Sequence, residues 1–264
     1  APMTTDQLHS ATRDGVTLRY LDTGTGDPPL LFIHGWCCNN TFWRDQIPHF
    51  SSKHRVVAVD LRGHGESDKP DEDYSIPAFV DDVAWLVGEL KLEKPVVVGH
   101  SMGGTIALNL ARKHPGLTRA IILVDSPVYP LPEGASILAG QTFAALQTPA
   151  YQGVAAGFVR MVMFNADSPP ILVEEIVAGM SSAPQRVMHT ALANTVADAS
   201  IVPGPIPVPA LFIRAATQIA SEDQLRERYP GLSVITVPGT AHFVQMEQPA
   251  AANNIISDFL DTLE

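Results

Sequence analysis

A serine flanked by glycines is the feature of this chain that most clearly suggests chemistry. Residues 99–103 read Gly-His-Ser-Met-Gly, which fits the pattern Gly-x-Ser-x-Gly, and they lie between an apolar β-branched run and a helix-compatible stretch, residues 105–113. A sharp strand-to-helix turn of this kind needs glycines, because side chains would clash where the backbone folds back on itself. The turn also leaves the hydroxyl open to a base. We therefore predict that Ser101 is a catalytic nucleophile.

The rest of the chain predicts the sheet that would carry this turn. Residues 16–21 predict an edge strand, and residues 76–90 predict a helix with one apolar face and Ser75 as its N-cap. A second helix is expected over residues 250–263. Continuous apolar runs predict buried parallel strands over 30–33, 56–59, 96–98, 121–124, 210–213 and 234–237. Strands alternating with helices predict an α/β protein whose mostly parallel sheet is flanked by helices.

One long segment interrupts this alternation. Residues 128–207 contain no convincing strand, are poor in charge, and are rich in Ala, Val, Met and Phe. Prolines at every second position from 203 to 209 stiffen the chain where it returns to the sheet. We expect one globular unit, with a core of residues 1–127 and 208–264 and a helical cap of residues 128–207 inserted between strands.

Four motifs follow one another in a characteristic order. His-Gly-Trp (34–36) follows the strand at 30–33, Asp-Leu-Arg-Gly-His-Gly-Glu-Ser (60–67) follows the next strand, and Gly-Thr-Ala-His-Phe (239–243) comes after the serine turn, near the C-terminus. In these motifs the chain resembles the α/β-hydrolase superfamily over nearly its whole length, and its esterase, lactonase and haloperoxidase group in particular. Residues 36–39 and 124–127 are most similar to small bacterial esterases, some of which open N-acyl homoserine lactones. The resemblance implies the α/β-hydrolase fold, with no cofactor and no metal site.

The resemblance also implies a base and an oxyanion hole for the nucleophile. His242 lies in a loop flanked by glycine and alanine just after the last expected strand, where this fold places its base. The expected oxyanion donors are two backbone N–H groups. One belongs to Met102, beside the nucleophile at the start of its helix, and the other belongs to Trp36.

The acid that would orient His242 is less obvious. In this fold it usually follows the strand at 210–213 in a Gly-x-x-Asp turn, but here Gln218 occupies the expected position. An amide cannot carry the negative charge that stabilises an imidazolium. Some members of the family place the acid one strand earlier, which is the position of Asp125. We predict Asp125 as the acid, with Glu222 or Asp223 as the alternatives.

The expected cap supplies most candidates for a substrate pocket. Large aromatic and thioether side chains offer soft apolar surface that adapts to irregular ligands. These candidates are Phe143, Leu146, Phe158, Met161, Met163 and Phe164. Cys37, close to the expected oxyanion loop, is predicted to line or back the same pocket. An apolar acyl or alkyl chain therefore suits this pocket better than a sugar or a phosphate.

These residues lead us to expect a serine hydrolase that cleaves carboxylic esters or lactones through an acyl-enzyme, with N-acyl homoserine lactones among the candidate substrates. Ser101 would attack, His242 would move the proton, and Asp125 would orient His242. Cofactor-free perhydrolysis or haloperoxidase chemistry, carbon–carbon bond hydrolysis, and a non-enzymatic ligand receptor remain alternatives on the same fold. Epoxide hydrolases and haloalkane dehalogenases are disfavoured, because they need a carboxylate nucleophile.

Composition restricts partners and compartment. There are 17 basic and 28 acidic residues, and the resulting net charge of −11 argues against nucleic acid or anionic membranes as partners. The two cysteines are adjacent and cannot form a disulfide framework, which favours a reducing compartment. No signal-peptide pattern and no apolar stretch long enough to cross a bilayer is seen. We expect a cytoplasmic protein whose partner is a small ester or lactone.

Overall fold

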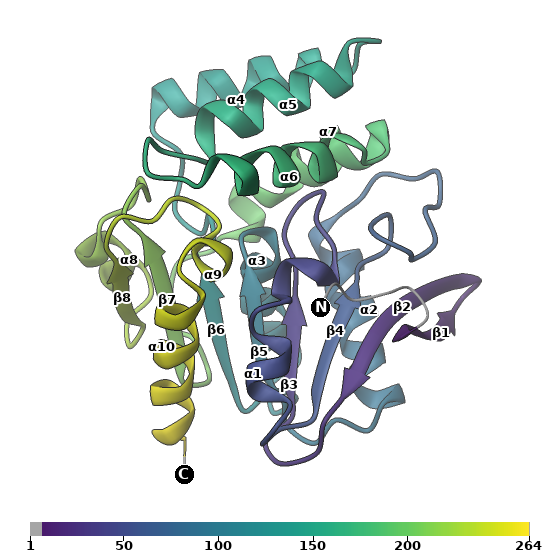
Figure 1. Ribbon diagram of the computed structural model, residues 1–264, viewed down its shortest axis with the longest axis vertical. Coiled ribbons are helices and arrows are strands. Elements are labelled where there is room, and N and C mark those ends of the chain that lie inside the picture. Colours follow the sequence, from purple (N-terminus) through teal and green to yellow (C-terminus); the bar gives the residue numbers. More distant parts are fainter. Residues whose placement is uncertain (1–6, 264) are drawn as a thin grey trace.

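The computed structural model describes residues 7–263, which form one eight-stranded sheet with helices on both faces (Figure 1). The strands lie in the order β1-β2-β4-β3-β5-β6-β7-β8; β1 and β2 pair antiparallel, as do β2 and β4, and the other pairs are parallel. The predicted fold class is confirmed. The strands are β1 His9–Arg13, β2 Val16–Thr23, β3 Leu30–Ile33, β4 Val56–Asp60, β5 Val96–His100, β6 Ala120–Val124, β7 Ala210–Ala215 and β8 Ser233–Val237.

The central strands coincide with the predicted apolar runs because both of their faces are covered. Every residue of β3, β4, β5 and β6 is buried, as expected of parallel strands between two layers of helices. The registers align the strand ends: Ile33 pairs with Val59 and Gly99, and His100 pairs with Val124. The loops that follow β3, β5 and β6 therefore leave the sheet at one common edge.

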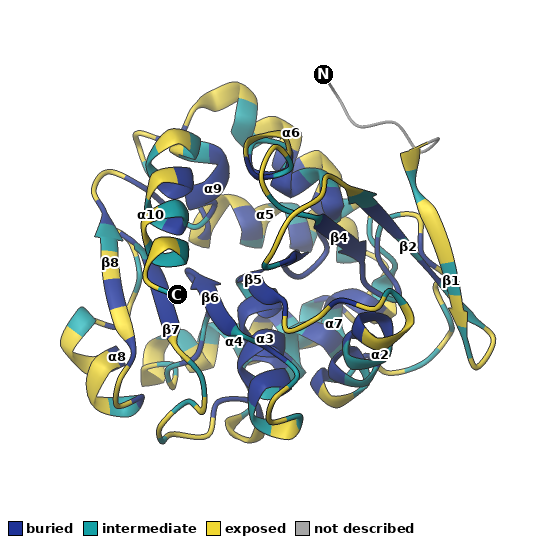
Figure 2. Cartoon of the chain, turned by 90° about the horizontal axis from the view of Figure 1, so that it is seen from below, coloured by how far each residue is buried: buried dark blue, intermediate teal, exposed yellow. Residues whose placement is uncertain are grey.

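Two apolar clusters, one on each face of the sheet, form the core. The first is covered by α2 (Ile76–Glu89), α3 (Met102–Lys113) and α8 (Glu222–Arg228), and the second by α1 (Ile47–Phe50) and α10 (Pro249–Asp261). Figure 2 shows the inner strands, such as β4, β5 and β6, in the colour of buried residues. Short helices complete this part of the chain: η2 Asn40–Trp43, η3 Asp198–Ser200 and α9 Val244–Glu247.

The sequence predicted the start of α2 correctly, but it did not identify the edge strand of the sheet. Ser75 caps α2 as predicted, because its hydroxyl accepts the Ala78 N–H at 3.2 Å. The expected edge strand, however, is β2, which lies between β1 and β4. On that side the edge is β1, which is mostly exposed, so its sequence lacks the apolar signal by which the inner strands are recognised. The strand predicted at residues 16–21 is therefore present as β2, but its predicted place at the edge of the sheet was wrong. The strand predicted as buried at 234–237 is β8, the opposite edge, and it is only partly buried, with Ile235 43% exposed.

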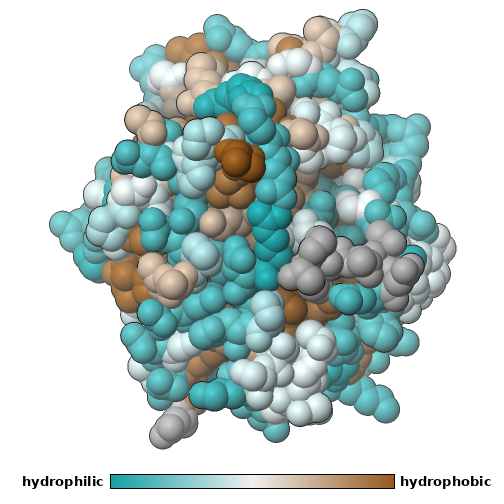
Figure 3. Space-filling model, viewed as in Figure 1, coloured by the Kyte–Doolittle hydropathy of each residue, from teal (hydrophilic) through white to brown (hydrophobic). Residues whose placement is uncertain are grey.

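Four α-helices, followed by the short η3, lie between β6 and β7 in the sequence, within residues 128–207. They are α4 (Glu133–Ala145), α5 (Tyr151–Val162), α6 (Pro170–Ser181) and α7 (Gln185–Thr195), and they lie together above the carboxyl ends of the strands (Figure 1). We call them the cap helices. On the face drawn in Figure 3, apolar side chains gather in small patches, several of them over these helices.

Both cysteines are buried and free, and burial raises the pKa of each thiol. In residues 7–263 no group of three or more His, Cys, Asp or Glu side chains is placed to hold a metal ion. None of the helices in that part of the chain combines the length and the apolar character needed to span a membrane.

Candidate active site

Ser101 sits on a strained turn between β5 and α3. Its backbone has φ +54° and ψ −120°, a conformation that a residue with a side chain seldom adopts and that cores enforce mainly at functional sites. The two neighbouring positions have room only for glycine. A Cβ added to Gly99 would lie 2.1 Å from the Gly103 carbonyl oxygen, and a Cβ added to Gly103 would lie 2.2 Å from the Ile33 carbonyl oxygen. The turn therefore has the geometry that the Gly-x-Ser-x-Gly pattern predicted.

The structure brings the three predicted catalytic side chains into one hydrogen-bonded chain. His242 Nε2 lies 2.9 Å from Ser101 Oγ, and His242 Nδ1 lies 2.7 Å from Asp125 Oδ2. A ring with its proton on Nδ1 satisfies both contacts, donating to the carboxylate and accepting the serine hydroxyl. This is the arrangement in which a histidine can take the serine proton and remain oriented by an acid.

The two alternative acids lie elsewhere. Glu222 begins α8, where its carboxylate accepts hydrogen bonds from Thr236 and Arg226. The side chain of Asp223 is 98% exposed and pairs with Arg226. Both serve the start of a surface helix, so Asp125 is the predicted acid that contacts His242.

The predicted oxyanion donors lie beside the nucleophile. Met102 is the first residue of α3, so its N–H is one that the helix does not use internally. The loop that carries Trp36 passes against Ser101, because a Cβ added at the preceding residue, Gly35, would lie 3.2 Å from the serine Cβ. The Trp36 indole donates to the Met188 carbonyl oxygen of α7 at 2.9 Å, which ties this loop to the cap helices.

A family model described as the alpha/beta hydrolase fold matches residues 28–160, half of the chain. The chain belongs to the α/β-hydrolase family. It is 29% identical over 262 residues to a 2-(acetamidomethylene)succinate hydrolase of Mesorhizobium japonicum, covering 93% of this chain and 92% of that protein. Two solved structures are also similar. An esterase from Thermogutta terrifontis has a TM-score of 0.83 at 25% identity, covering 97% of this chain and 99% of the esterase. Est816, described as an N-acyl homoserine lactone degrading enzyme, has a TM-score of 0.78 at 26% identity, covering 95% and 100%.

Two buried histidines support the active-site loops of this hydrolase. His34 joins two of them: its Nδ1 donates to the Gly35 carbonyl oxygen at 2.8 Å, and its Nε2 accepts the Leu61 N–H at 3.0 Å. Burial lowers the pKa of His34 to about 4, so the ring is neutral and keeps both roles. His100 Nε2 donates to the His242 carbonyl oxygen at 2.8 Å, and burial lowers its pKa well below the usual value. Both residues hold the site rather than react.

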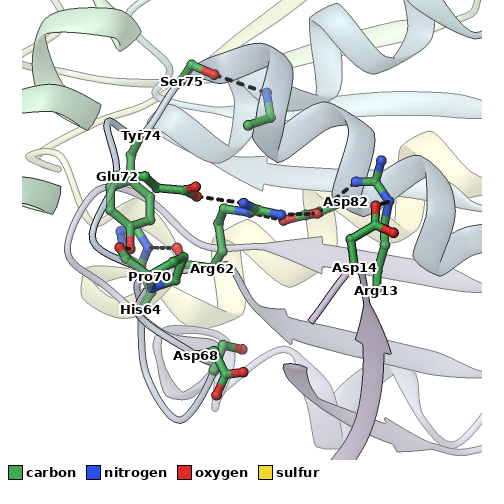
Figure 4. A network of polar contacts seen from close by, with 12 residues as sticks. Arg13, Asp14, Arg62, His64, Asp68, Pro70, Glu72, Tyr74, Ser75 and Asp82 are labelled. Atoms are coloured by element: carbon green, nitrogen blue, oxygen red, sulfur yellow. Dashed lines mark hydrogen bonds and ion pairs between the residues drawn. The ribbon is translucent and has the colours of Figure 1, made fainter. Parts of the chain in front are cut away.

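The loop of residues 60–67 supports the structure of the hydrolase through hydrogen bonds of Asp60 and Arg62. Asp60 Oδ1 accepts the Asn40 N–H at 2.8 Å, and Asp60 Oδ2 accepts the Glu66 N–H at 2.9 Å. The Arg62 guanidinium donates to Asp82 of α2 and to Glu72, as Figure 4 shows. Hydrogen bonds to these carboxylates, chiefly to Asp82, raise the pKa of the guanidinium.

Glu247 holds the loop that carries His242. Its two carboxylate oxygens accept the N–H groups of Ala241 and Phe243 at 3.2 and 3.1 Å, and its Oε1 also accepts the Ser168 hydroxyl at 3.2 Å. Burial raises the pKa of this carboxyl group. The His242 N–H donates to the Met163 carbonyl oxygen at 3.2 Å. His242 is therefore held both by Glu247 of α9, the helix that follows it, and by the segment between α5 and α6.

Next to the triad lies a cavity of about 220 Å³ between the core and the cap helices. Ser101, His242 and Asp125 all reach its wall, as do Trp36 and Met102. Most of the remaining wall is apolar and comes from the segment after β6, the cap helices and the loop after β7. It includes Pro127, Tyr129, Leu131, Leu138, Phe143, Phe158, Val162, Met163, Leu192 and Ile219.

Of the residues predicted for the pocket, Phe143, Phe158 and Met163 line this cavity, and four others do not. Leu146 and Cys37 are buried in the core cluster, Met161 is 61% exposed on α5, and the ring of Phe164 stacks on Phe243, with centroids 5.7 Å apart. Sequence reasoning missed Leu138 and Leu192. Because the cap helices are apolar toward both the cavity and the core, residue type alone does not separate the two faces.

Gln218 lies where the family pattern led us to expect the acid, and it has a polar role at the same place. Its Nε2 donates to Asp125 Oδ1 at 2.9 Å, and its side chain reaches the cavity wall. The Ala215 N–H donates to the same carboxylate oxygen at 3.0 Å. From the sequence, this position was notable only because Gln218 stands where a carboxylate was expected.

Proposed function

We propose that the protein is a serine hydrolase that cleaves carboxylic esters or lactones bearing an apolar acyl group. One observation carries the proposal: the chain Ser101–His242–Asp125 is hydrogen-bonded throughout and opens onto a mainly apolar cavity. A serine hydroxyl activated by an oriented imidazole is the nucleophile that acyl transfer needs.

In the proposed reaction, Ser101 Oγ attacks the carbonyl carbon while His242 Nε2 takes the serine proton. The N–H groups of Met102 and Trp36 would stabilise the negative oxygen of the tetrahedral intermediate. His242 then gives its proton to the departing alkoxide as the ester C–O bond breaks, leaving an acyl-enzyme. Water, deprotonated by His242, releases the acid and restores the serine. With a lactone, alcohol and acid remain in one ring-opened product.

The cavity favours a neutral substrate. Its described lining contains no Lys or Arg, and its one carboxylate, that of Asp125, is engaged by His242 and Gln218. A substrate carboxylate placed there would lose water without gaining a cation. This argues against the dicarboxylate named for the Mesorhizobium japonicum relative. It favours neutral esters or lactones, among them the N-acyl homoserine lactones named for Est816.

A substrate panel tests the proposal. Initial rates are measured on p-nitrophenyl esters of increasing acyl length, on N-acyl homoserine lactones, and on 2-(acetamidomethylene)succinate, with Ser101→Ala as the matched blank. We expect kcat/KM to be highest on neutral substrates with apolar acyl chains, and activity to disappear in the variant. Preferred turnover of the dicarboxylate would contradict the proposed substrate class. Folded protein that is silent on every member of the panel would favour carbon–carbon bond hydrolysis on other substrates, perhydrolysis, or a receptor role.

A further inference from the structure

The carboxylate of Asp125 divides its contacts between its two oxygens. Oδ2 faces His242 Nδ1 at 2.7 Å, and Oδ1 accepts the Ala215 N–H at 3.0 Å and the Gln218 side-chain N–H at 2.9 Å. One oxygen therefore serves the base, and the other is held by two donors from the end of β7 and the loop that follows it.

This division matters because Asp125 is buried. The residue is 4% exposed, and in the described chain its ion-pair partner is His242, with no Lys or Arg pairing with it. A buried carboxylate without a cation depends on hydrogen-bond donors to replace the water it has lost. Two donors on Oδ1 also prevent the carboxylate from rotating, which keeps Oδ2 directed at the ring.

Gln218 is itself held in place by Arg214. The guanidinium donates to the Gln218 carbonyl oxygen at 3.0 Å and to the Ala220 carbonyl oxygen at 2.8 Å. The Gln218 N–H donates to the Ala215 carbonyl oxygen at 3.1 Å. Because the backbone of the loop is fixed, the amide reaches Asp125 from a stable base and loses little conformational entropy in doing so.

We propose that Gln218 is a positioning residue of the active site, acting on His242 through Asp125. Its amide supplies the second donor on Oδ1, so that Oδ2 stays committed to the base. The position that would otherwise carry the acid thus carries the group that holds an acid from the neighbouring strand. The inference rests on the proposed serine hydrolase function, and its tests include measurements that need no substrate.

Gln218→Leu tests the donor directly. The variant keeps an extended side chain and removes the amide, so kcat on the best ester or lactone should fall about 10- to 100-fold, the range for losing a hydrogen bond to a buried charged group. KM should change little. Thr217→Val is the matched control on the same loop, because Thr217 reaches the cavity wall and should affect KM alone. Gln152→Leu, the same substitution at an exposed site on α5, should leave both constants unchanged.

Two readouts separate positioning from substrate contact. The first is the rate at which phenylmethylsulfonyl fluoride, a small serine reagent, inactivates the protein; it should fall in Gln218→Leu by a factor similar to that in kcat. The second is the low-field proton resonance of His242 Nδ1–H on Asp125, which should weaken or shift in this variant and persist in Thr217→Val.

Gln218→Glu adds a pH test. A protonated carboxyl can donate to Asp125 as the amide does, whereas an ionised one cannot donate and repels the neighbouring carboxylate. The titratable or charged groups facing it are Asp125, His242 and Arg214, all unchanged in the variant. The ratio of variant to wild-type kcat should therefore fall as pH rises, and the same ratio for Gln218→Leu should stay level.

The outcomes are distinct. If Gln218→Leu raises KM while kcat, the inactivation rate and the low-field resonance stay at wild-type values, Gln218 only lines the pocket and the proposal is overturned. If the wild type turns over no ester or lactone, the proposed function fails, and the inactivation rate and the resonance still decide whether Gln218 positions Asp125.

Discussion

The catalytic loops of the core and the cap helices are built in different ways. Ser101 and Asp125 both have positive φ and follow strands whose residues are all buried, so the surrounding core enforces their strained backbone. The two outer cap helices bury few residues: α4 buries Thr142 alone, and α5 buries Ala155 and Val159. The other two bury more, three residues in α6 and four in α7. The core therefore fixes the positions of Ser101 and Asp125, whereas the outer cap helices form an apolar wall that is held by fewer buried residues.

The links of the cap to the rest of the molecule show the same contrast. Several are exposed ion pairs, such as those of Arg186 on α7 with Asp71 and Asp73, and such pairs contribute little. Buried or partly buried hydrogen bonds join the cap to the active-site loops, from the Trp36 indole to Met188 and from Ser168 to Glu247. Others join α7 to the backbone of Tyr74. Because several of these links lie beside the cavity, we predict that cap substitutions affect substrate preference before they affect stability.

The largest effect is expected at the core end of the triad. Asp125→Asn removes the charge that stabilises the imidazolium and should lower kcat roughly 10³- to 10⁴-fold. Steady-state kinetics on the best substrate measures the loss, and an unchanged melting temperature shows that the fold is intact. Activity near the wild-type level would mean that the triad is assigned incorrectly.

The next effect concerns stability. Phe212→Ala opens a cavity at a fully buried position of β7 and should lower the free energy of unfolding by about 3–5 kcal/mol. Phe143→Ala, the same substitution at a partly exposed site of the cap, should cost much less. Urea unfolding of both variants makes the comparison, and equal losses would show that the cap is as tightly packed as the core.

Acid should destabilise the core through its neutral histidines. Burial lowers the pKa of His34 to about 4 and that of His64 to about 3. Below pH 6.5 the unfolded chain therefore binds protons at these two histidines, whereas the native state does not. Stability is then present above pH 6.5 and falls as pH drops toward 4, by roughly 1.4 kcal/mol per pH unit for each such histidine. Urea midpoints across this range measure the slope. His64→Gln should reduce it, and His49→Gln, at an exposed site, should not.

A smaller effect is expected on the cavity wall. Phe143→Ala should raise KM for long acyl chains roughly 5- to 10-fold, as removal of apolar contact at a partly exposed site predicts, and should change kcat little. A chain-length series of esters measures the preference. Met161→Ala serves as the control, because that side chain points outward; a similar KM change there would mean that the substrate follows a different path.

The smallest effect is expected at the surface of the cap. Arg160→Ala breaks the exposed pair with Glu174 and should leave the melting temperature within experimental error. Thermal unfolding measured by circular dichroism is sufficient. A clear decrease would show that α5 and α6 depend on this pair, and the contrast between core and cap would then be weaker than proposed.

The sequence by itself determined the features that depend on local chemistry. Continuous apolar runs located the inner strands, because a strand covered on both faces has no polar side to show. Ser75 located the start of α2, because a cap is read from one residue and its neighbours. The glycines around Ser101 indicated the strained turn, because only small residues fit where the backbone closes on itself.

Only the tertiary structure decided the features that depend on which faces meet. In the folded chain the exposed β1 is an edge strand, Met161 is exposed to solvent, and Leu138 lines the cavity. Asp125 contacts His242, and Glu222 and Asp223 do not, because the end of β6 lies beside His242 and the start of α8 does not. The amide of Gln218 lies on Asp125 although 93 residues separate them. Residue type and spacing cannot specify such contacts, since they arise when strand ends from distant parts of the chain are aligned in one sheet.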